Sequence, residues 1–207
     1  MQTVRYITHT CLIGKNKIYK DGSFIFEHVG NAEDFFNDTY VHFEMAYPKF
    51  HKMDALCKLG FLSAEILLSG QTTTKKYEGK DIGLVLSNAH SSLDVDLRYA
   101  KTIHSGASPA LFVYTLPNIV IGEISIRHGF KGENAFFVFK HFDGNFIAAY
   151  INSLFENSLI RAGICGWVDI LKEDYRAHLM MVESDNEGKA IPFTEENLNK
   201  LNQTEHG

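Results

Sequence analysis

The hydrophobic and polar positions divide the first third of the chain into strand-like and helix-like segments. Residues 4–13 and 17–27 have the composition of β-strands, and an Asp-Gly turn interrupts the second of them. Over residues 53–69 apolar side chains recur every three or four positions. This spacing predicts an amphipathic helix, which Gly70 ends.

The rest of the chain continues this alternation. Residues 31–47 mix aromatic and acidic side chains without a clear period, and the polar tail from residue 195 is either a frayed end or a short helix. The expected strands are residues 81–88, 135–139, 164–170 and 177–183. The expected helices are residues 93–103, 119–127 and 145–162, the last of them with Gly163 in the left-handed position that follows a helix.

The stretch from Ser108 to Leu154 contains the most informative change of pattern. A helix ending at Gly129 is followed by the wholly apolar run Ala135–Phe139, which is typical of a strand buried on both faces. Residues 141–145 then turn directly into the next helix, and Asp143 is placed to accept hydrogen bonds from the free amides of that helix. Such a strand–elbow–helix turn is where many enzymes carry a nucleophile.

The segment SIRHGFKGENAFFVFKHFDGN resembles the nucleophile segment of the β-ketoacyl-acyl carrier protein synthases, which belong to the thiolase superfamily. In that family a helix ending in R-Y-G-x-x-G-P-N leads into a strand and then into T-A-C-(A/S)-(T/S)-G. Aligning Gly144-Asn145 with the Gly-Asn of the family places His141 where the nucleophilic cysteine belongs. The resemblance therefore implies the scaffold of the nucleophile site without its thiol.

The resemblance covers residues 48–184 well and residues 1–47 weakly. It implies an α/β fold, a thiolase-like half with a mixed, mostly parallel sheet and helices on both faces. Residues 1–207 are then expected to form one truncated domain that corresponds to the N-terminal half of a ketosynthase. The other catalytic groups of the family, two histidines and a Gly-rich oxyanion loop, lie in the second half and have no counterpart in this sequence.

Composition and charge exclude several classes of function. The chain has 207 residues and a net charge of −5, with no basic patch for nucleic acid or an anionic membrane. No apolar run approaches the roughly 20 residues that span a bilayer, and no signal peptide is predicted. Three widely spaced cysteines favour reduced thiols and a cytoplasmic protein. No histidine–cysteine spacing predicts a metal site, and no glycine pattern predicts a cofactor.

His141 has two interpretations. Its imidazole could act as a general base, oriented by Asp143 or by a carboxylate of a partner. Alternatively, it is a polar plug in the vacated cysteine site, or it bonds across an interface. Without a thiol that becomes acylated, it cannot run a decarboxylative condensation. Cys57 and Cys165 lie in apolar surroundings and are expected to be buried structural residues.

The resemblance also implies an interface. In ketosynthase dimers the loop before the helix that corresponds to residues 119–127 crosses to the neighbouring subunit and shapes its acyl pocket. In this sequence that loop would contain Tyr114, Leu116 and Pro117. Ordinary core packing beneath the elbow is the alternative. In the same family the strand before the elbow pairs antiparallel with its two-fold mate. The further residues assigned to the pocket or interface are Phe137, Val138, Phe139 and Phe146.

The helix after the elbow has six consecutive residues without a charge, Phe146 to Ile151. At about 100° per residue, these uncharged side chains are distributed over the whole circumference of the helix. We therefore expect the helix to be buried on all sides. Either the terminal segments of the chain or another chain must cover it. We expect another chain.

The resemblance implies a chain-length-factor type of subunit, the inactive partner of a condensing enzyme in fatty-acid or polyketide-type pathways, including those of aryl polyenes or related pigments. Its expected partners are a full-length ketosynthase and acyl carrier protein, in a homo- or heterodimer. One alternative is a homodimer that binds an acyl group or acyl carrier protein without catalysis. Another is an enzyme that uses His141 as a general base.

Overall fold

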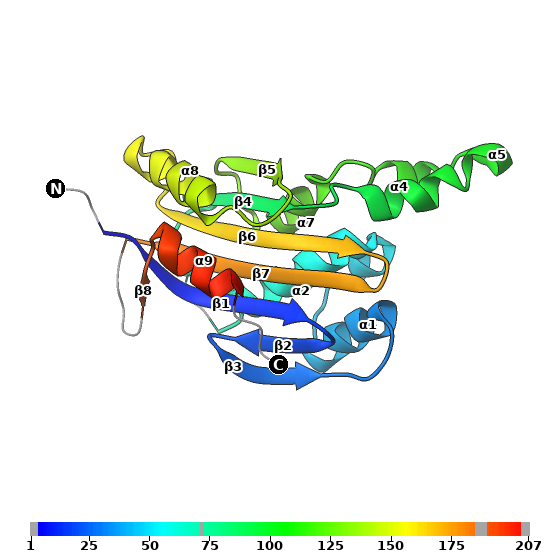
Figure 1. Ribbon diagram of the computed structural model, residues 1–207, viewed down its shortest axis with the longest axis horizontal. Helices are drawn as coiled ribbons and strands as arrows, with labels where there is room; N and C mark the ends of the chain where they lie inside the picture. Colours follow the sequence, from blue (N-terminus) through cyan, green and yellow to red (C-terminus); the bar gives the residue numbers. More distant parts are fainter. Residues whose placement is uncertain (1–3, 71–72, 185–189, 204–207) are drawn as a thin grey trace.

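The computed structural model describes residues 4–70, 73–184 and 190–203, and these form one mixed sheet between two layers of helices (Figure 1). The order of the strands is β3-β2-β1-β7-β6-β4-β5, and β8 pairs with β1 beside this path. The strands are β1 (Tyr6–Gly14), β2 (Lys17–Lys20), β3 (Ser23–Glu27), β4 (Ile82–Asn88), β5 (Asn134–Val138), β6 (Ala162–Leu171), β7 (Asp174–Glu183) and β8 (Ile191–Pro192).

Parallel pairing is confined to β6, β4 and β5. The α/β class, the mixed sheet and the helices on both faces are confirmed, and the parallel part is smaller than expected. The N-terminal strands form an antiparallel meander, and β7 returns from β6 after only two residues, so these pairs are antiparallel. The carboxyl ends of β4, β5 and β6 therefore meet at one edge of the sheet.

The helices cover the sheet unequally. Helices α1, α2 and α7 lie behind it, and α8 and α9 lie in front (Figure 1). In the described residues no helix is long and apolar enough to cross a membrane. The helices are α1 (Ala32–His42), α2 (Ala55–Leu68), α3 (Thr73–Lys76), α4 (Leu93–Ala100), α5 (Ile103–Gly106), α6 (Pro109–Phe112), α7 (Ile119–His128), α8 (Gly144–Glu156) and α9 (Glu195–Gln203), with 3₁₀ turns at Pro48–Lys52 and Gly79–Asp81.

Helix α2 is the centre of the rear layer, as its amphipathic pattern predicts. Asp54 caps its first turn, and most of its side chains are buried between the sheet, α1 and α7. Gly60 allows α7 to approach closely, because a Cβ atom at this position would lie 2.2 Å from Cγ2 of Val120. Helix α7 is thereby fixed against α2, and it places the chain for β5.

Helix α8 is shorter than its sequence predicts. It ends at Glu156, and Ala162, which was expected to be helical, begins β6. Ser158 takes the left-handed conformation, with φ of 56°, which was expected of Gly163. The amide of Ser158 bonds to the carbonyl of Phe155 at 3.0 Å, and that of Leu159 to the carbonyl of Leu154 at 2.9 Å. This is the paired hydrogen bonding of a Schellman cap, which ends a helix sharply.

The expectation that α8 is buried on all sides is not met within this chain, and covering of its exposed side by another chain stays a prediction. Ile147, Ile151 and Leu154 face the sheet and are buried. Helix α9 of the same chain lies along another side and buries Leu198 against this cluster. The side that bears Phe146 remains exposed. The polar tail is thus a short helix that covers part of α8.

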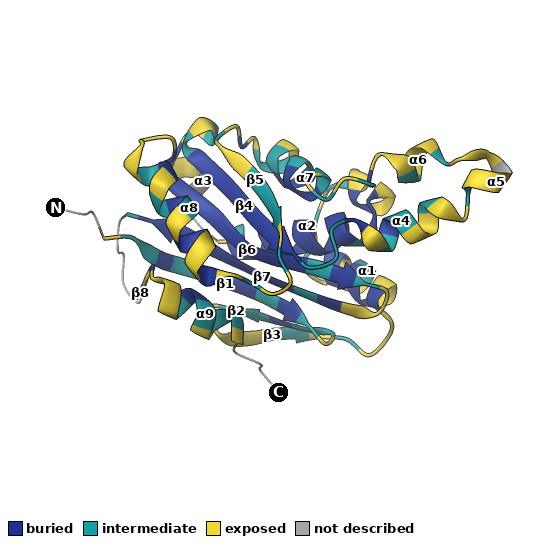
Figure 2. Ribbon diagram, turned by 45° about the horizontal axis from the view of Figure 1, so that its top comes forward, coloured by how far each residue is buried: buried dark blue, intermediate teal, exposed yellow. Residues whose placement is uncertain are grey.

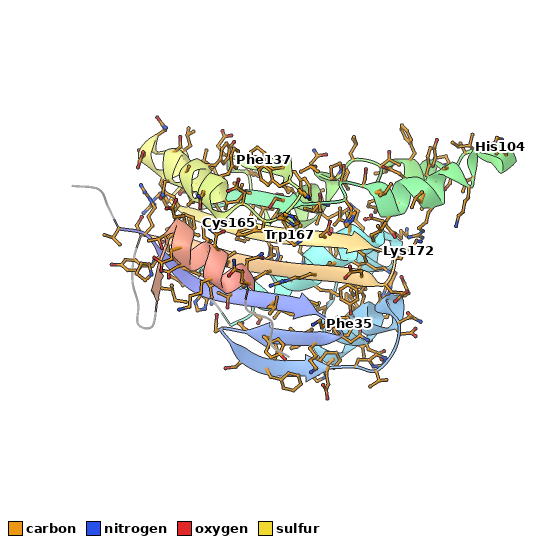
Figure 3. The ribbon with its side chains drawn as sticks, viewed as in Figure 1. Phe35, His104, Phe137, Cys165, Trp167 and Lys172 are labelled. Carbon is orange, nitrogen blue, oxygen red and sulfur yellow. The ribbon has the colours of Figure 1, made fainter. Side chains whose placement is uncertain are left out.

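Helices α4, α5 and α6 form an arm that extends away from the body of the molecule (Figures 1 and 2). The arm begins at Leu93, and His104 lies at its far end (Figure 3). The helix expected over residues 93–103 ends earlier, at Ala100. Several large apolar side chains of the arm are exposed, and the most exposed is Phe112, at 60%. The arm has the composition of a surface that contacts another protein.

We predict that Ser158→Gly stabilises the protein by about 0.5–1 kcal/mol. A left-handed conformation costs a residue with a Cβ atom roughly 1–2 kcal/mol, and glycine gives back about half of this through the greater freedom of the unfolded chain. Urea unfolding measures the change. Ser158→Val is the matched control and should destabilise, because β-branched residues fit this conformation poorly. A glycine variant that is less stable than wild type would contradict the assigned cap.

Candidate functional site

The elbow, residues 139–143, connects the end of β5 to the start of α8. The amide of Phe139 bonds to the carbonyl of Asn88 at 2.9 Å, so the ends of β5 and β4 remain side by side. His141 follows two residues later and is exposed. In the described part of the chain its imidazole has no hydrogen bond or ion pair. The residue expected at the position of the nucleophile is therefore not oriented by any of the described residues.

Asp143 acts as the cap of α8, as its position predicts. Its Oδ1 accepts a hydrogen bond from the amide of Phe146 at 2.9 Å. An N-cap of this kind satisfies one of the free donors at the start of a helix. The hydrogen bonds thus assign this carboxylate to the helix and not to the imidazole of His141.

Asn199 of α9 closes the start of α8 from the other side. Its Oδ1 accepts from the amide of Gly144 at 3.1 Å, and its Nδ2 donates to Oδ1 of Asn145 at 3.2 Å. A Cβ atom on Gly144 would lie only 2.4 Å from Oδ1 of Asn199, so glycine is required for this approach. Enzymes that stabilise an oxyanion at an elbow need free amides there. Here the amides of residues 144 and 146 already have partners.

Asn199 was not identified from the sequence, because the tail is polar. A local signal was present. The hydroxyl of Thr194 caps the first turn of α9, accepting from the amide of Asn197 at 3.2 Å. Phe193 and Leu198 flank this cap with the spacing of a hydrophobic staple, and both are buried in the cluster around α8.

The three cysteines are buried and unpaired, as expected for Cys57 and Cys165. Desolvation raises the pKa of Cys165, on β6, to about 12 (Figure 3). Burial likewise raises the pKa of Cys11 and Cys57 well above the usual range of a thiol. Since the thiolate is the reactive form, none of the three is a nucleophile near neutral pH.

An aromatic cluster connects β5 to the exposed side of α8. The ring of Phe137 lies edge-on to the rings of Phe146 and Tyr150, with 4.7 Å and 5.2 Å between the ring centres. The ring of Phe139 lies 5.1 Å from that of Phe146. Phe146 keeps 37% of its surface exposed. Phe137, Phe139 and Phe146, all assigned to a pocket or interface, thus form one apolar surface on the front of the sheet, whereas Val138 points to the other face.

Strand β5 is the last strand of the sheet and pairs only with β4 among the described strands. The burial on both faces expected for residues 135–139 is not seen within the chain. Three of the five residues of β5 are half-buried, and Val138 is 51% exposed. An apolar strand with a free edge is a site for pairing with another chain.

The structure separates the three residues assigned to the loop before α7. Tyr114 is buried in the core behind the sheet, where desolvation and the nearby carboxylate of Glu123 raise the pKa of its phenol. Pro117 is half-buried, and Leu116 is exposed at the surface. Core packing therefore accounts for Tyr114, and Leu116 remains available for an interface.

A histidine–aspartate pair near the elbow was also not found from the sequence. His90 follows the end of β4, and its Nδ1 lies 2.8 Å from Oδ2 of Asp169 near the end of β6. Oδ1 of the same carboxylate accepts from the amides of Ala89 and His90, at 3.1 and 3.0 Å. The two residues are 79 positions apart, so no local motif indicates them. No group of histidine, cysteine or acidic side chains in the described residues could hold a metal ion.

Comparison with known proteins extends this description to the fold. No family model and no curated protein matches the sequence. Solved structures match strongly, at low identity. One is the ishigamide ketosynthase/chain length factor, with 14% identity and a TM-score of 0.66 over 91% of this chain and 64% of the other. Another is a type II polyketide synthase acyl-carrier protein in complex with its ketosynthase, with 12% identity and a TM-score of 0.62 over 88% of this chain and 64% of the other.

A third match is the ketosynthase in complex with its chain length factor from Xenorhabdus doucetiae, with 8% identity and a TM-score of 0.53 over 90% of this chain and 81% of the other. The chain thus has the fold of thiolase-like ketosynthases. It spans 64% of the length of the first two matched chains.

We predict that Asn199→Ala destabilises the protein by roughly 1–3 kcal/mol, because it leaves the amide of Gly144 without its partner. Hydrogen exchange at this amide should become faster, and urea unfolding should report the loss. Glu196→Ala, on the exposed side of the same helix, is the control and should change neither quantity. Unchanged exchange at Gly144 in Asn199→Ala would show that α9 does not close the elbow.

Proposed function

We propose that this protein is a non-catalytic, chain-length-factor-type subunit. It pairs with an active β-ketoacyl synthase in fatty-acid or polyketide-type biosynthesis, such as the formation of aryl polyenes or related pigments. The ketosynthase fold supports this assignment, and so do the names of the matched structures, two of which contain a chain length factor.

The closed elbow carries the proposal. A condensing enzyme needs a thiolate to take up the acyl group and free donors to stabilise the oxyanion. The elbow has His141 in place of the thiol, and Asp143 and Asn199 occupy amides at the start of α8. All three thiols of the chain lie buried elsewhere. The residues at the expected nucleophile site thus serve to connect α8 to α9 and do not offer a reactive thiol.

The exposed surface of the edge strand β5 and of the arm supports pairing with a second chain. Strand β5 offers unpaired backbone groups, and the exposed side chains of Val138, Leu116 and Phe112 are apolar. Both β5 and the arm lie on the side of the molecule away from β3 (Figures 1 and 2). A large apolar surface of this kind is typical of a protein interface.

Two other functions use the same features differently. A homodimer that binds an acyl group or acyl carrier protein would use β5 to pair with a second copy of itself. An enzyme with His141 as general base would need an orienting group from a partner, since the chain supplies none among its described residues. An adjacent gene for a full-length ketosynthase with a T-A-C-x-x-G motif would favour the subunit.

We predict that the isolated chain forms no acyl-enzyme and no β-ketoacyl product with acyl- and malonyl-acyl carrier protein. Its position for the acylated thiol holds an imidazole, and its own thiols are buried. Intact-mass spectrometry detects the adduct, and chromatography detects the product. A covalent acyl group on any cysteine would overturn the proposal.

His141→Cys extends this test. A thiol at the elbow should still give no condensation, because the two further histidines and the Gly-rich oxyanion loop of the family have no counterpart in this sequence. The same two assays apply, with an active ketosynthase as the positive control. Turnover in His141→Cys would mean that the site lacks only its thiol.

We predict that Val138→Lys weakens association by more than about tenfold, because an unpaired ammonium group buried at an interface costs several kcal/mol. Since Val138 is exposed in the single chain, the melting temperature of the monomer should change little. Sedimentation of the chain alone, and of its mixture with the neighbouring ketosynthase, distinguishes homo- from heterodimers.

Val41→Lys is the control for this variant. Val41 is exposed on α1, at the other edge of the sheet, so its substitution should leave association unchanged. Identical sedimentation of Val138→Lys and wild type, in every mixture that shows a complex, would remove β5 from the interface.

A further inference from the structure

We propose that His90 and Asp169 form a general-base site for ester or thioester carbonyl groups, in which His90 takes up the proton and Asp169 positions its ring. This activity lies beyond the proposed role in a ketosynthase complex and does not depend on it. The inference rests on the contrast between His90, which Asp169 orients, and His141, which none of the described residues orients.

The first step is the fixed tautomer of His90. A carboxylate only accepts hydrogen bonds, so Nδ1, at 2.8 Å from Oδ2 of Asp169, carries the hydrogen. Whenever the ring is neutral, its lone pair is then on Nε2. Nε2 has no partner in the described residues, and the side chain is 37% exposed. The pair therefore presents a basic nitrogen to solvent in one tautomer.

The second step is that the loop does not need the imidazole to hold its shape. The buried side chain of Asn88 accepts from the amide of Ser91 at 2.9 Å and donates to its carbonyl at 2.8 Å. Oδ1 of Asp169 takes the amides of Ala89 and His90. The loop is held by these bonds, and Oδ2 is directed to the ring alone. Residues that act as general bases in hydrolases are oriented by a carboxylate in this way.

The third step is the position of the pair in the fold. His90 and Asp169 lie at the edge where parallel strands end, which is where open α/β sheets bind ligands. On β6, Trp167 precedes Asp169 by two residues and so lies on the same face of the sheet. Phe142 of the elbow packs edge-on against Trp167, with 6.3 Å between the ring centres. Trp167 and Phe142 thus place apolar surface on the same face of the sheet as Asp169, which suits an uncharged acyl group.

The reaction that this geometry supports is hydrolysis. Water adds its oxygen to the carbonyl carbon while Nε2 of His90 takes up one of its protons. The bond from carbon to the alkoxide or thiolate then breaks, and the leaving group either takes the proton from Nε2 or departs as the anion while Nε2 releases that proton to water. The products are one carboxylic acid and one alcohol or thiol, and the imidazole returns to its starting form.

Hydrolysis of 4-nitrophenyl acetate by the full-length chain tests the proposal. General-base catalysis typically accelerates a reaction by about 10²–10⁴-fold. The hydrolysis rate of the protein, after the rate of free imidazole is subtracted, should therefore fall by at least about tenfold in His90→Gln. His141→Gln removes an exposed imidazole from the same edge and is the matched control. It should stay within about twofold of wild type, because no carboxylate of the described residues orients that ring.

Asp169→Asn tests the positioning role. Asparagine keeps an oxygen for the two amides but loses the charge and can turn a donor toward Nδ1, so the rate should fall as in His90→Gln. The ¹⁵N spectrum of the ring nitrogens should show a change of tautomer at His90 and none at His141. If Asp169 served only to hold the loop through its two amide hydrogen bonds, Asp169→Asn would leave the tautomer of His90 unchanged.

Two results would overturn the site. One is a wild-type rate no greater than that of free imidazole. The other is a His90→Gln variant that retains the wild-type melting temperature and the wild-type rate. If Asp169→Asn unfolds, His90→Gln alone decides, since its side chain can still bond to Oδ2. Neither outcome bears on acyl-enzyme formation or on association through β5.

Discussion

Both faces of the central sheet are apolar, and the need to cover each of them determines how this chain is arranged. Behind the sheet, α2 is buried on nearly every side and α7 packs on it through the gap left by Gly60. In front, α8 covers only part of the surface, and α9 returns from the C-terminal segment to cover more. Burial of a side chain such as Leu198 contributes about 1.5–3 kcal/mol, enough to hold a short helix in place.

The placement of α9 has a chemical consequence at the elbow. Once Leu198 is buried beside α8, Asn199 follows it along the helix and meets the amide of Gly144. A helix start with free amides can stabilise an anion, whereas one with occupied amides cannot. The same packing that completes the front layer therefore also occupies an amide donor at the start of α8.

Much of the fold could be predicted because its signals are local. The period of residues 53–69, the left-handed Gly129 and the cap Asp143 each report on their own neighbours, and the structure has all three. The end of α8 could not be predicted, because Ser158 adopts a conformation usually given to glycine. The covering of α8 could not be predicted either, since it depends on Asn199, 55 positions from its partner.

The candidate site shows the same division between local and distant information. The sequence identified His141, because a motif surrounds it, but a motif says nothing of what orients a ring. His90 has no motif, yet Asp169 reaches it from a strand that is far away in sequence and adjacent in the sheet. An imidazole becomes a dependable base when its tautomer and direction are fixed, and both depend on the second residue of the pair. Among the residues that the structure describes, His141 has no such partner, whereas His90, which the sequence did not indicate, is paired with Asp169.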